Sequence, residues 1–192
     1  HGRKSTAKII NSSNSNLQSD TINGITVSDD GILWLATDAG VSYLKPGEAS
    51  FKNINHFTHK QLPEGIVTAV AVDGGTAWIG TFDNGLYRYD IAGGNVTRVL
   101  YDPLRDSALH SQAITSLLAL PKRGLIVGTY GGGLSVVDSD GQVVRTIRSL
   151  AGSQISDIIY ALLLDHDDGI LIGNEQGVAK LSSDLQTLAD TD

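Results

Sequence analysis

The segment ILWLATDAGVSYL at residues 32–44 is the first of four related stretches, and their repetition decides the fold. The later copies read AWIGTFDNGLYRYD at 77–90, LIVGTYGGGLSVVD at 125–138 and ILIGNEQGVAKL at 170–181. The glycines that close the turns recur at intervals of 45, 48 and 44 residues, at Gly40, Gly85, Gly133 and Gly177. A period of about 40–50 residues, with short apolar runs separated by glycine turns, is typical of β-propeller blades. The sequence therefore predicts an all-β protein of four-stranded antiparallel blades, about four of them in this chain.

The second repeat shows how one blade is built. Residues 67–72 (VTAVAV) form an apolar run of high β propensity, as expected of an inner strand that is buried on both faces. Glycine turns separate it from three further strands, which we predict at 77–81, 86–90 and 96–101. The other repeats follow the same plan, with inner strands at 22–27, 114–120 and 158–164 and outer strands at 51–54, 143–147 and 185–188.

The four repeats span approximately residues 17–57, 62–101, 109–148 and 155–188 of a single propeller domain, 1–192, because stacked repeats share one continuous core. Residues 5–10 (STAKII) stand where the outer strand of an earlier blade would be, so residues 1–16 read as that strand and its link. We therefore expect the chain to be an excerpt of a larger propeller, of about seven blades. An unclosed arc would expose apolar blade faces, which other blades or a second copy of the chain (a dimer) could cover.

Composition and charge exclude several classes of function. The net charge is −7 and the basic residues are scattered, so the chain lacks the basic stripe that nucleic acid or anionic lipid requires. The absence of cysteine excludes disulfides, thiolate catalysis and cysteine-ligated zinc. The sequence has neither an apolar run of about 18 residues nor a signal peptide, so we expect no direct membrane insertion by this segment. Because there is no methionine, we expect an excised soluble segment of a longer protein.

The second repeat resembles the repeat of the two-component regulator propeller family. That repeat typically has an aspartate–glycine turn, then Leu-Trp-Ile-Gly-Thr, Gly-Leu and Arg-Tyr-Asp. The matching residues here are Asp73, Trp78-Ile79-Gly80-Thr81, Asn84-Gly85-Leu86 and Arg88-Tyr89-Asp90. The resemblance covers roughly residues 17–181. Departures from the pattern are Ala36 for glycine, Ile126 and Leu171 for tryptophan, and Asn174 for threonine.

The resemblance implies a function as well as a fold. Members of the family form multi-bladed propellers in the periplasmic part of membrane-bound sensors, with histidine kinases or diguanylate cyclases as output modules. It therefore implies that this chain is a non-catalytic, ligand-sensing input domain in the periplasm. The sequence itself contains no kinase, receiver or cyclase motif and no Walker or dinucleotide fingerprint, so we expect no cofactor.

Two features have a structural interpretation. Trp34 and Trp78 occupy equivalent strand positions, which favours packing between blades over a ligand platform. The acidic segment 165–169 (DHDDG) superficially resembles a calcium loop, but it occupies the slot of the hairpin turns Asp29-Asp30-Gly31 and Asp73-Gly74-Gly75. We therefore predict a turn there and no metal site. Gly131-Gly132-Gly133 is likewise the third copy of a turn and not a phosphate loop.

The best candidate binding residues lie where the repeats disagree. The turns between second and third strands share one face of a propeller with the links between blades, and loops on a rigid scaffold are free to carry recognition. Phe82 and Tyr130 are aromatic residues in such turns, beside carboxylates and amides, a mixture that suits a polar ligand with apolar faces such as a sugar. The predicted ligand-binding residues are Asp38, Phe82, Asp83, Asn84, His110, Tyr130, Glu175 and Gln176.

Two other functions compete with ligand sensing. Streptogramin lyases have propellers of similar repeat with a histidine, carboxylates and a metal on the top face, and His110, Asp83 and Glu175 would form that group here. A protein-interaction scaffold would place its partner on the same face. A small-molecule or oligosaccharide ligand remains the first hypothesis, since no nucleophile-elbow pattern of a catalytic triad is present.

Overall fold

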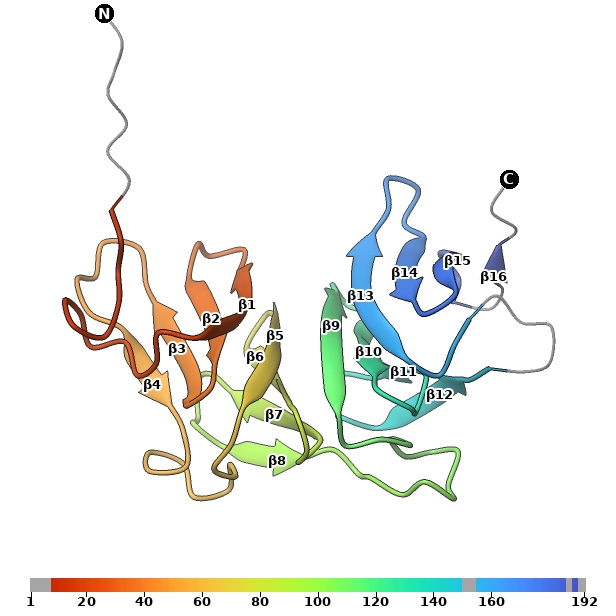
Figure 1. Cartoon of the computed structure of the whole chain (residues 1–192), viewed down its shortest axis with the longest axis horizontal. Helices are drawn as coiled ribbons and strands as arrows, with labels where there is room; N and C mark the ends of the chain where they lie inside the picture. Colours follow the sequence, from red (N-terminus) through yellow and green to blue (C-terminus); the bar gives the residue numbers. More distant parts are fainter. Residues whose placement is uncertain (1–7, 150–154, 186–187, 190–192) are drawn as a thin grey trace, which may run out of the picture.

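A computed structural model describes residues 8–149, 155–185 and 188–189. These residues contain sixteen β-strands and no helix. The strands form four sheets, each of four antiparallel strands in chain order, as predicted for a propeller of four blades. Figure 1 shows the sheets side by side around an arc, with the first strand of each near the middle and the last at the periphery.

The blades follow the repeats. Blade 1 comprises β1 (Ile22–Val27), β2 (Leu33–Thr37), β3 (Gly40–Leu44) and β4 (Lys52–Ile54). Blade 2 comprises β5 (Val67–Asp73), β6 (Thr76–Thr81), β7 (Leu86–Asp90) and β8 (Val96–Arg98). Blade 3 comprises β9 (Ile114–Leu120), β10 (Gly124–Thr129), β11 (Leu134–Val137) and β12 (Val143–Ile147). Blade 4 comprises β13 (Ile159–Leu164), β14 (Ile170–Asn174), β15 (Gly177–Leu181) and β16 (Leu188–Ala189).

The turn that closes β6 onto β7 shows why the glycine recurs. Gly85 has φ of +84°, a backbone conformation that costs glycine little and that side chains disfavour. The hydroxyl of Thr81 donates to the Gly85 carbonyl at 2.7 Å and accepts the Asn84 N–H at 3.0 Å. This buried threonine therefore caps the turn from inside, which explains why threonine and glycine recur together in the repeat.

The core lies between blades, as predicted for the two tryptophans. Trp34 is fully buried against residues of blade 2, and Trp78 is 2% exposed among residues of blade 3. Ile126 takes the equivalent place between blades 3 and 4. A large apolar side chain from the second strand of one blade thus fills the gap to the next blade.

The described structure is an open arc. Contacts between inner strands run from β1 to β5, from β5 to β9 and from β9 to β13, and Figure 1 shows β1 and β13 at its two ends. The faces at the ends are exposed, since Ile22 of β1 is 42% and Val178 of β15 is 62% exposed.

The peripheral strands differ from the predictions. Residues 8–10 lie in no strand, and the remainder of the predicted outer strand 5–10 lies outside the described residues. The outer strand predicted at 96–101 ends at Arg98, because Tyr101 leaves the sheet to form a parallel bridge with Leu109 of the link. The last outer strand is found at Leu188–Ala189 rather than at 185–188, and residues 186–187 are not described.

Candidate functional site

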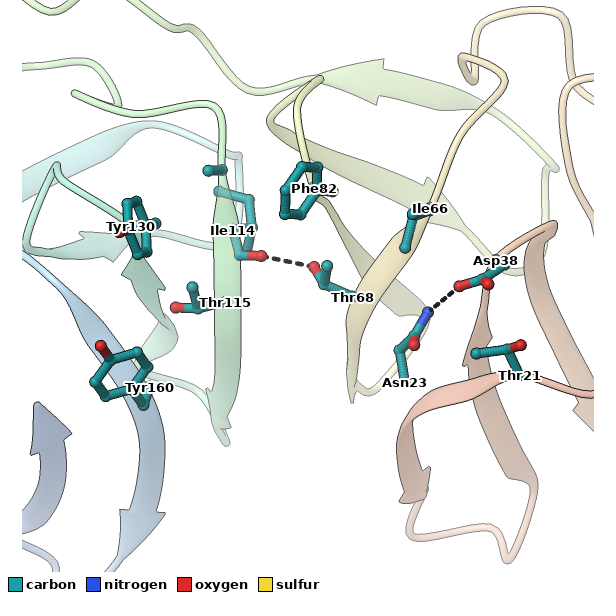
Figure 2. Close-up of a pocket in the computed structure, with 11 residues that line it drawn as sticks. Thr21, Asn23, Asp38, Ile66, Thr68, Phe82, Ile114, Thr115, Tyr130 and Tyr160 are labelled. Atoms are coloured by element: carbon teal, nitrogen blue, oxygen red, sulfur yellow. Dashed lines mark hydrogen bonds between the residues drawn. The ribbon is translucent and has the colours of Figure 1, made fainter.

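A pocket of about 680 Å³ opens in the middle of the arc, at the end of the molecule where the inner strands begin. Figure 2 shows Tyr130 and Tyr160 on one side, Thr21, Asn23 and Asp38 on the opposite side, and Phe82 between them. All four blades contribute to its lining, which consists of Thr21, Asn23, Asp38, Ile66, Thr68, Phe82, Ala113, Ile114, Thr115, Tyr130 and Tyr160.

One set of lining residues comes from the turns between second and third strands. Asp38, Phe82 and Tyr130 each directly follow the threonine that ends the second strand of their blade. The backbone fixes their position, because the N–H of Phe82 donates to the carbonyl of Ile66 at 3.0 Å and that of Tyr130 to the carbonyl of Ala113 at 2.9 Å. The same device therefore presents the side chains of Phe82 in blade 2 and Tyr130 in blade 3, and these residues are 61% and 58% exposed.

A second set comes from a β-bulge that every inner strand carries at the same place. In blade 2, Val67 pairs with Thr81 and Ala69 with Gly80, so Thr68 has no partner in the ladder. The shift leaves the corresponding residue of each other blade without a partner, namely Asn23, Thr115 and Tyr160. All four of these residues line the pocket. Bulges commonly re-aim a side chain in this way beside functional sites.

The bulged residues also join neighbouring blades. Asn23 donates through Nδ2 to the carbonyl of Val67 at 3.0 Å. The hydroxyl of Thr68 donates to the carbonyl of Ile114 at 2.6 Å, as Figure 2 shows. The amide of Asn23 also donates to a carboxylate oxygen of Asp38 at 2.8 Å. The polar side of the pocket is therefore fixed by hydrogen bonds before any ligand arrives.

The lining favours an uncharged ligand with both apolar and polar surfaces. Three exposed rings, those of Phe82, Tyr130 and Tyr160, offer apolar faces on which a sugar or another flat ring can stack. Asp38 is the one charged residue of the lining, and no lysine or arginine among the lining residues would hold an anion. Pockets of this size, mostly apolar with a few fixed polar groups, are typical of small-molecule sites.

The structure brings together three of the eight predicted binding residues, Asp38, Phe82 and Tyr130. The other five do not line the pocket. Asp83 and Asn84 are joined to each other by a hydrogen bond of 2.6 Å, and Glu175 accepts a hydrogen bond from Ser156 at 3.2 Å. Gln176 is exposed in its turn, and His110 is half-buried in the link before blade 3. The binding roles of all eight residues stay predictions.

Sequence reasoning missed the bulged residues. The inner strands were expected to be apolar throughout, and Asn23, Thr68 and Thr115 interrupt that pattern with polar side chains at equivalent positions. Tyr160 does so with an exposed ring. Polar residues that recur in an otherwise apolar strand, and differ from repeat to repeat, were the available signal.

Two carboxylates of the acidic turn at 165–169 are paired with a lysine side chain from a neighbouring strand. The ammonium of Lys180 lies 2.7 Å from a carboxylate oxygen of Asp165 and 2.6 Å from one of Asp167. Hydrogen bonds from Lys180, and then from His166, hold the pKa of Asp165 well below its usual range. The backbone forms a hairpin turn, with the N–H of Asp165 donating to the carbonyl of Gly169 at 2.8 Å, as predicted.

The lyase hypothesis needs His110, Asp83 and Glu175 to meet around a metal. Within the described part of the chain, the one cluster of three side chains close enough to hold a metal is Asp165, His166 and Asp167, the turn just described. His110, Asp83 and Glu175, which are all described, form no such cluster.

Comparison with known proteins gives matches among solved structures only. No protein-family model matches the chain, and no curated protein sequence matches it. The extracellular domain of BT3049, described as a hybrid two-component system of B. thetaiotaomicron, superposes with a TM-score of 0.73 at 21% identity. The match covers 92% of this chain and 25% of that one. The extracellular domain of BT4673, described as a one-component system of the same organism, gives a TM-score of 0.71 at 22% identity, over 89% and 22% of the two chains.

The likeness is one of fold. The chain spans about a quarter of the length of the two B. thetaiotaomicron chains, 25% and 22%. A computationally designed protein, Ika4, also matches with a TM-score of 0.62 at 18% identity, over 86% of this chain and 93% of the design. Among the described residues, no helix is long and apolar enough to cross a membrane.

Proposed function

We propose that this chain is the extracytoplasmic ligand-sensing part of a bacterial signal-transduction protein, located in the periplasm. Its ligand is an uncharged small molecule or oligosaccharide that binds in the central pocket without being chemically changed. The repeat resembles that of the two-component regulator propellers. The fold is shared with extracellular domains from a hybrid two-component and a one-component system of B. thetaiotaomicron, which supports the proposal.

The observation that carries the proposal is the exposure of three aromatic rings around one pocket. Tyr160 is 55% exposed, and the rings of Phe82 and Tyr130 are exposed to a similar degree. Aromatic rings that are exposed to water at a mostly apolar pocket with a few fixed polar groups are suited to stack against the apolar face of a sugar. The carboxylate of Asp38 and the carbonyl of Asn23 lie opposite, where they can accept hydrogen bonds from sugar hydroxyls.

The arrangement also gives binding a route to signalling. Because lining residues come from all four blades, a ligand in the pocket contacts several blades at once. A ligand that makes more contacts in one arrangement of the blades than in another shifts the protein toward that arrangement. The output modules of such sensors would read that shift.

The test is calorimetric titration of the chain with cello-, manno- and galacto-oligosaccharides. We expect one series to bind, and Tyr130→Ala and Tyr160→Ala to weaken its affinity about tenfold each, the effect of losing one stacked ring. Phe57→Ala is the matched control, because Phe57 is 77% exposed but lies in the link 55–65, outside the pocket lining. A bound sugar whose affinity is indifferent to Tyr130 and Tyr160 would exclude this pocket as the site.

A further inference from the structure

The exposed face of blade 4 carries apolar side chains at positions that are buried in every other blade. In the strand register, Val178 pairs with Gly173 as Leu86 pairs with Gly80. Val178 is 62% exposed, whereas Leu86 and its two other equivalents, Val41 and Leu134, are fully buried. What differs is the next blade, which covers this face in blades 1 to 3.

The exposed face of blade 1 shows the complementary pattern. Ile22 is the residue that pairs with the threonine ending the second strand, and its equivalents are Val67, Ile114 and Ile159. Ile22 is 42% exposed, whereas these three are 5%, 1% and 0% exposed. In blades 2, 3 and 4 this side chain is covered by the preceding blade.

The covered interfaces show what these two positions do. A Cβ atom added at Gly80 would lie 2.5 Å from Cγ2 of Ile114, and one added at Gly128 would lie 2.7 Å from Cγ2 of Ile159. The isoleucine that begins one inner strand therefore sits directly on the glycine of the preceding blade. The missing side chain of the glycine leaves a space, here called the glycine socket, that the isoleucine of the next blade occupies.

The first interface keeps the same total volume with different residues. Blade 1 has Ala36 where the others have glycine, and the residue packed there from blade 2 is Val67 instead of isoleucine. One side gains a methyl group and the other loses one, as dense packing requires. This compensation shows that the two positions form a matched pair.

At the ends of the arc, each half of such a pair is present without its partner. The three atoms nearest to a Cβ added at Gly173 all belong to Ala161 of its own blade and lie 3.5 Å or more away, so the socket on blade 4 is open. Ile22 is a free isoleucine of the kind that fills the two other glycine sockets. We propose that Ile22 of one copy packs on Gly173 of a second copy, so that two chains join head to tail into one closed ring.

The other exposed residues on the end faces of blades 1 and 4 are also suited to contact with a second copy of the chain. Ile25 and Val27 of β1 are 69% and 62% exposed, and Leu163 of blade 4 is 62% exposed at the position where Ala71 of blade 2 is buried against blade 3. Lys180, the charged residue in register with Leu171 on blade 4, is already neutralised by Asp165 and Asp167. Apart from this ion-paired group, which keeps one negative charge in excess, the residues named on both faces are apolar, and burying them favours association.

Two copies also give a number of blades that is found in closed rings. The contact is heterologous, with blade 4 of each chain against blade 1 of the other, and such contacts end in a closed ring when the rotation permits. Two chains of four blades give eight, within the range of about four to eight blades for closed propellers. Each chain thereby covers both of its exposed faces.

The test is sedimentation of the 192-residue chain, of two variants with one substitution each on the end faces, and of one control variant. We expect the wild type to be a dimer, and Gly173→Val and Ile22→Asp each to be monomers, because overpacking or a buried charge raises the dissociation constant at least about tenfold per joint. Gly173→Val should still unfold cooperatively, at about the Tm of monomeric Ile22→Asp, because it loses only the stability that association adds and the new side chain has room within its own blade. Leu104→Asp is the control, because Leu104 is 95% exposed in a link away from both faces, and it should remain dimeric.

An equimolar mixture of Gly173→Val and Ile22→Asp makes the result specific. One intact joint remains in the mixed pair, between Gly173 of one variant and Ile22 of the other, so the mixture should dimerise although neither variant does so alone. A monomeric wild type, a dimer that survives both substitutions, or a mixture that stays monomeric would each overturn the proposal. The double variant Gly173→Ala, Ile22→Val, which copies the pair Ala36 and Val67, should dimerise like the wild type.

Discussion

Blades 2 and 4 have the same strand order and register, but one is covered on both faces and the other on one. Leu86 of blade 2 is fully buried and Val178 of blade 4 is 62% exposed at the same position. Gly80 lies under Ile114, and Gly173 lies open. The comparison shows that burial in this fold is set by the neighbouring blade rather than by the blade itself, so equivalent substitutions should have unequal costs.

The largest difference is expected for truncation of the apolar side chain on this face. Leu86→Ala removes a fully buried side chain and should lower the free energy of unfolding by about 2–5 kcal/mol. Val178→Ala should change it by no more than about 0.5 kcal/mol, as for an exposed position. Urea denaturation measures both, in the Ile22→Asp background so that association does not contribute. Equal costs would mean that the face of blade 4 is covered within the single chain.

The next difference concerns the glycines. Gly80→Val would force a side chain against Ile114 and Leu117 and should cost about 1–3 kcal/mol by overpacking. Gly173→Val, with no atom of another residue within 3.4 Å of the added Cβ, should leave the free energy of unfolding of the monomer nearly unchanged. The measurement is again urea denaturation in the Ile22→Asp background. A large cost at Gly173 would show that this glycine is required by its own blade.

The sequence predicted the blades because they rest on local signals. Glycine turns such as Asp83-Asn84-Gly85 and the apolar runs between them recur at one period, and the structure confirms four four-stranded sheets. The burial of Trp34 and Trp78 between blades was predictable for the same reason, since a large ring repeated at one position packs repeatedly. Outer strands were predicted less well, because their short ladders end where the link begins to pair elsewhere, as at Tyr101.

The site was only partly predictable, for a physical reason. Asp38, Phe82 and Tyr130 stand out because turns between strands are variable. Thr68 and Tyr160 were missed, because a β-bulge aims them into the pocket and its one signal in the sequence is the recurrence of unlike residues at the same position of the inner strands. His110 and Glu175 were grouped with Asp83 by chemistry alone, and the structure forms no cluster of the three.

A smaller difference in the free energy of unfolding is expected among the residues at the β-bulges of the inner strands. The hydroxyl of Thr68 donates to the carbonyl of Ile114 in the next blade. No further blade among the described residues covers Tyr160 of blade 4, which is 55% exposed. Thr68→Val removes the hydrogen bond and should cost about 1 kcal/mol. Thr115→Val is the matched control, because the buried Thr115 hydroxyl has no hydrogen-bond partner among the described residues. We expect the control to change the free energy of unfolding by less than about 0.5 kcal/mol in urea denaturation.

The smallest effect separates Arg88 from Lys180, which occupy the same register position in blades 2 and 4. Lys180 bonds to Asp165 and Asp167 of its own blade, and these bonds lower the pKa of both carboxyls and raise that of the ammonium. A lowered carboxyl pKa stabilises the fold above the unfolded value, near pH 4, and that contribution is lost as the pH falls through the folded value. The raised pKa of the lysine matters at the alkaline end of the pH range, because its contribution to stability is lost only above about pH 10.

Thermal denaturation of the wild type and Lys180→Met should therefore give a constant difference in Tm between about pH 5 and 9, which shrinks below about pH 4. Because the three groups are partly exposed, the difference should be small and should decrease at high salt. Arg88→Met is the control, since Arg88 forms no ion pair among the described residues and should give no acid-dependent difference. A difference at Lys180 that stays constant below about pH 4 would mean that the lysine acts through packing on blade 4 and not through its two carboxylates.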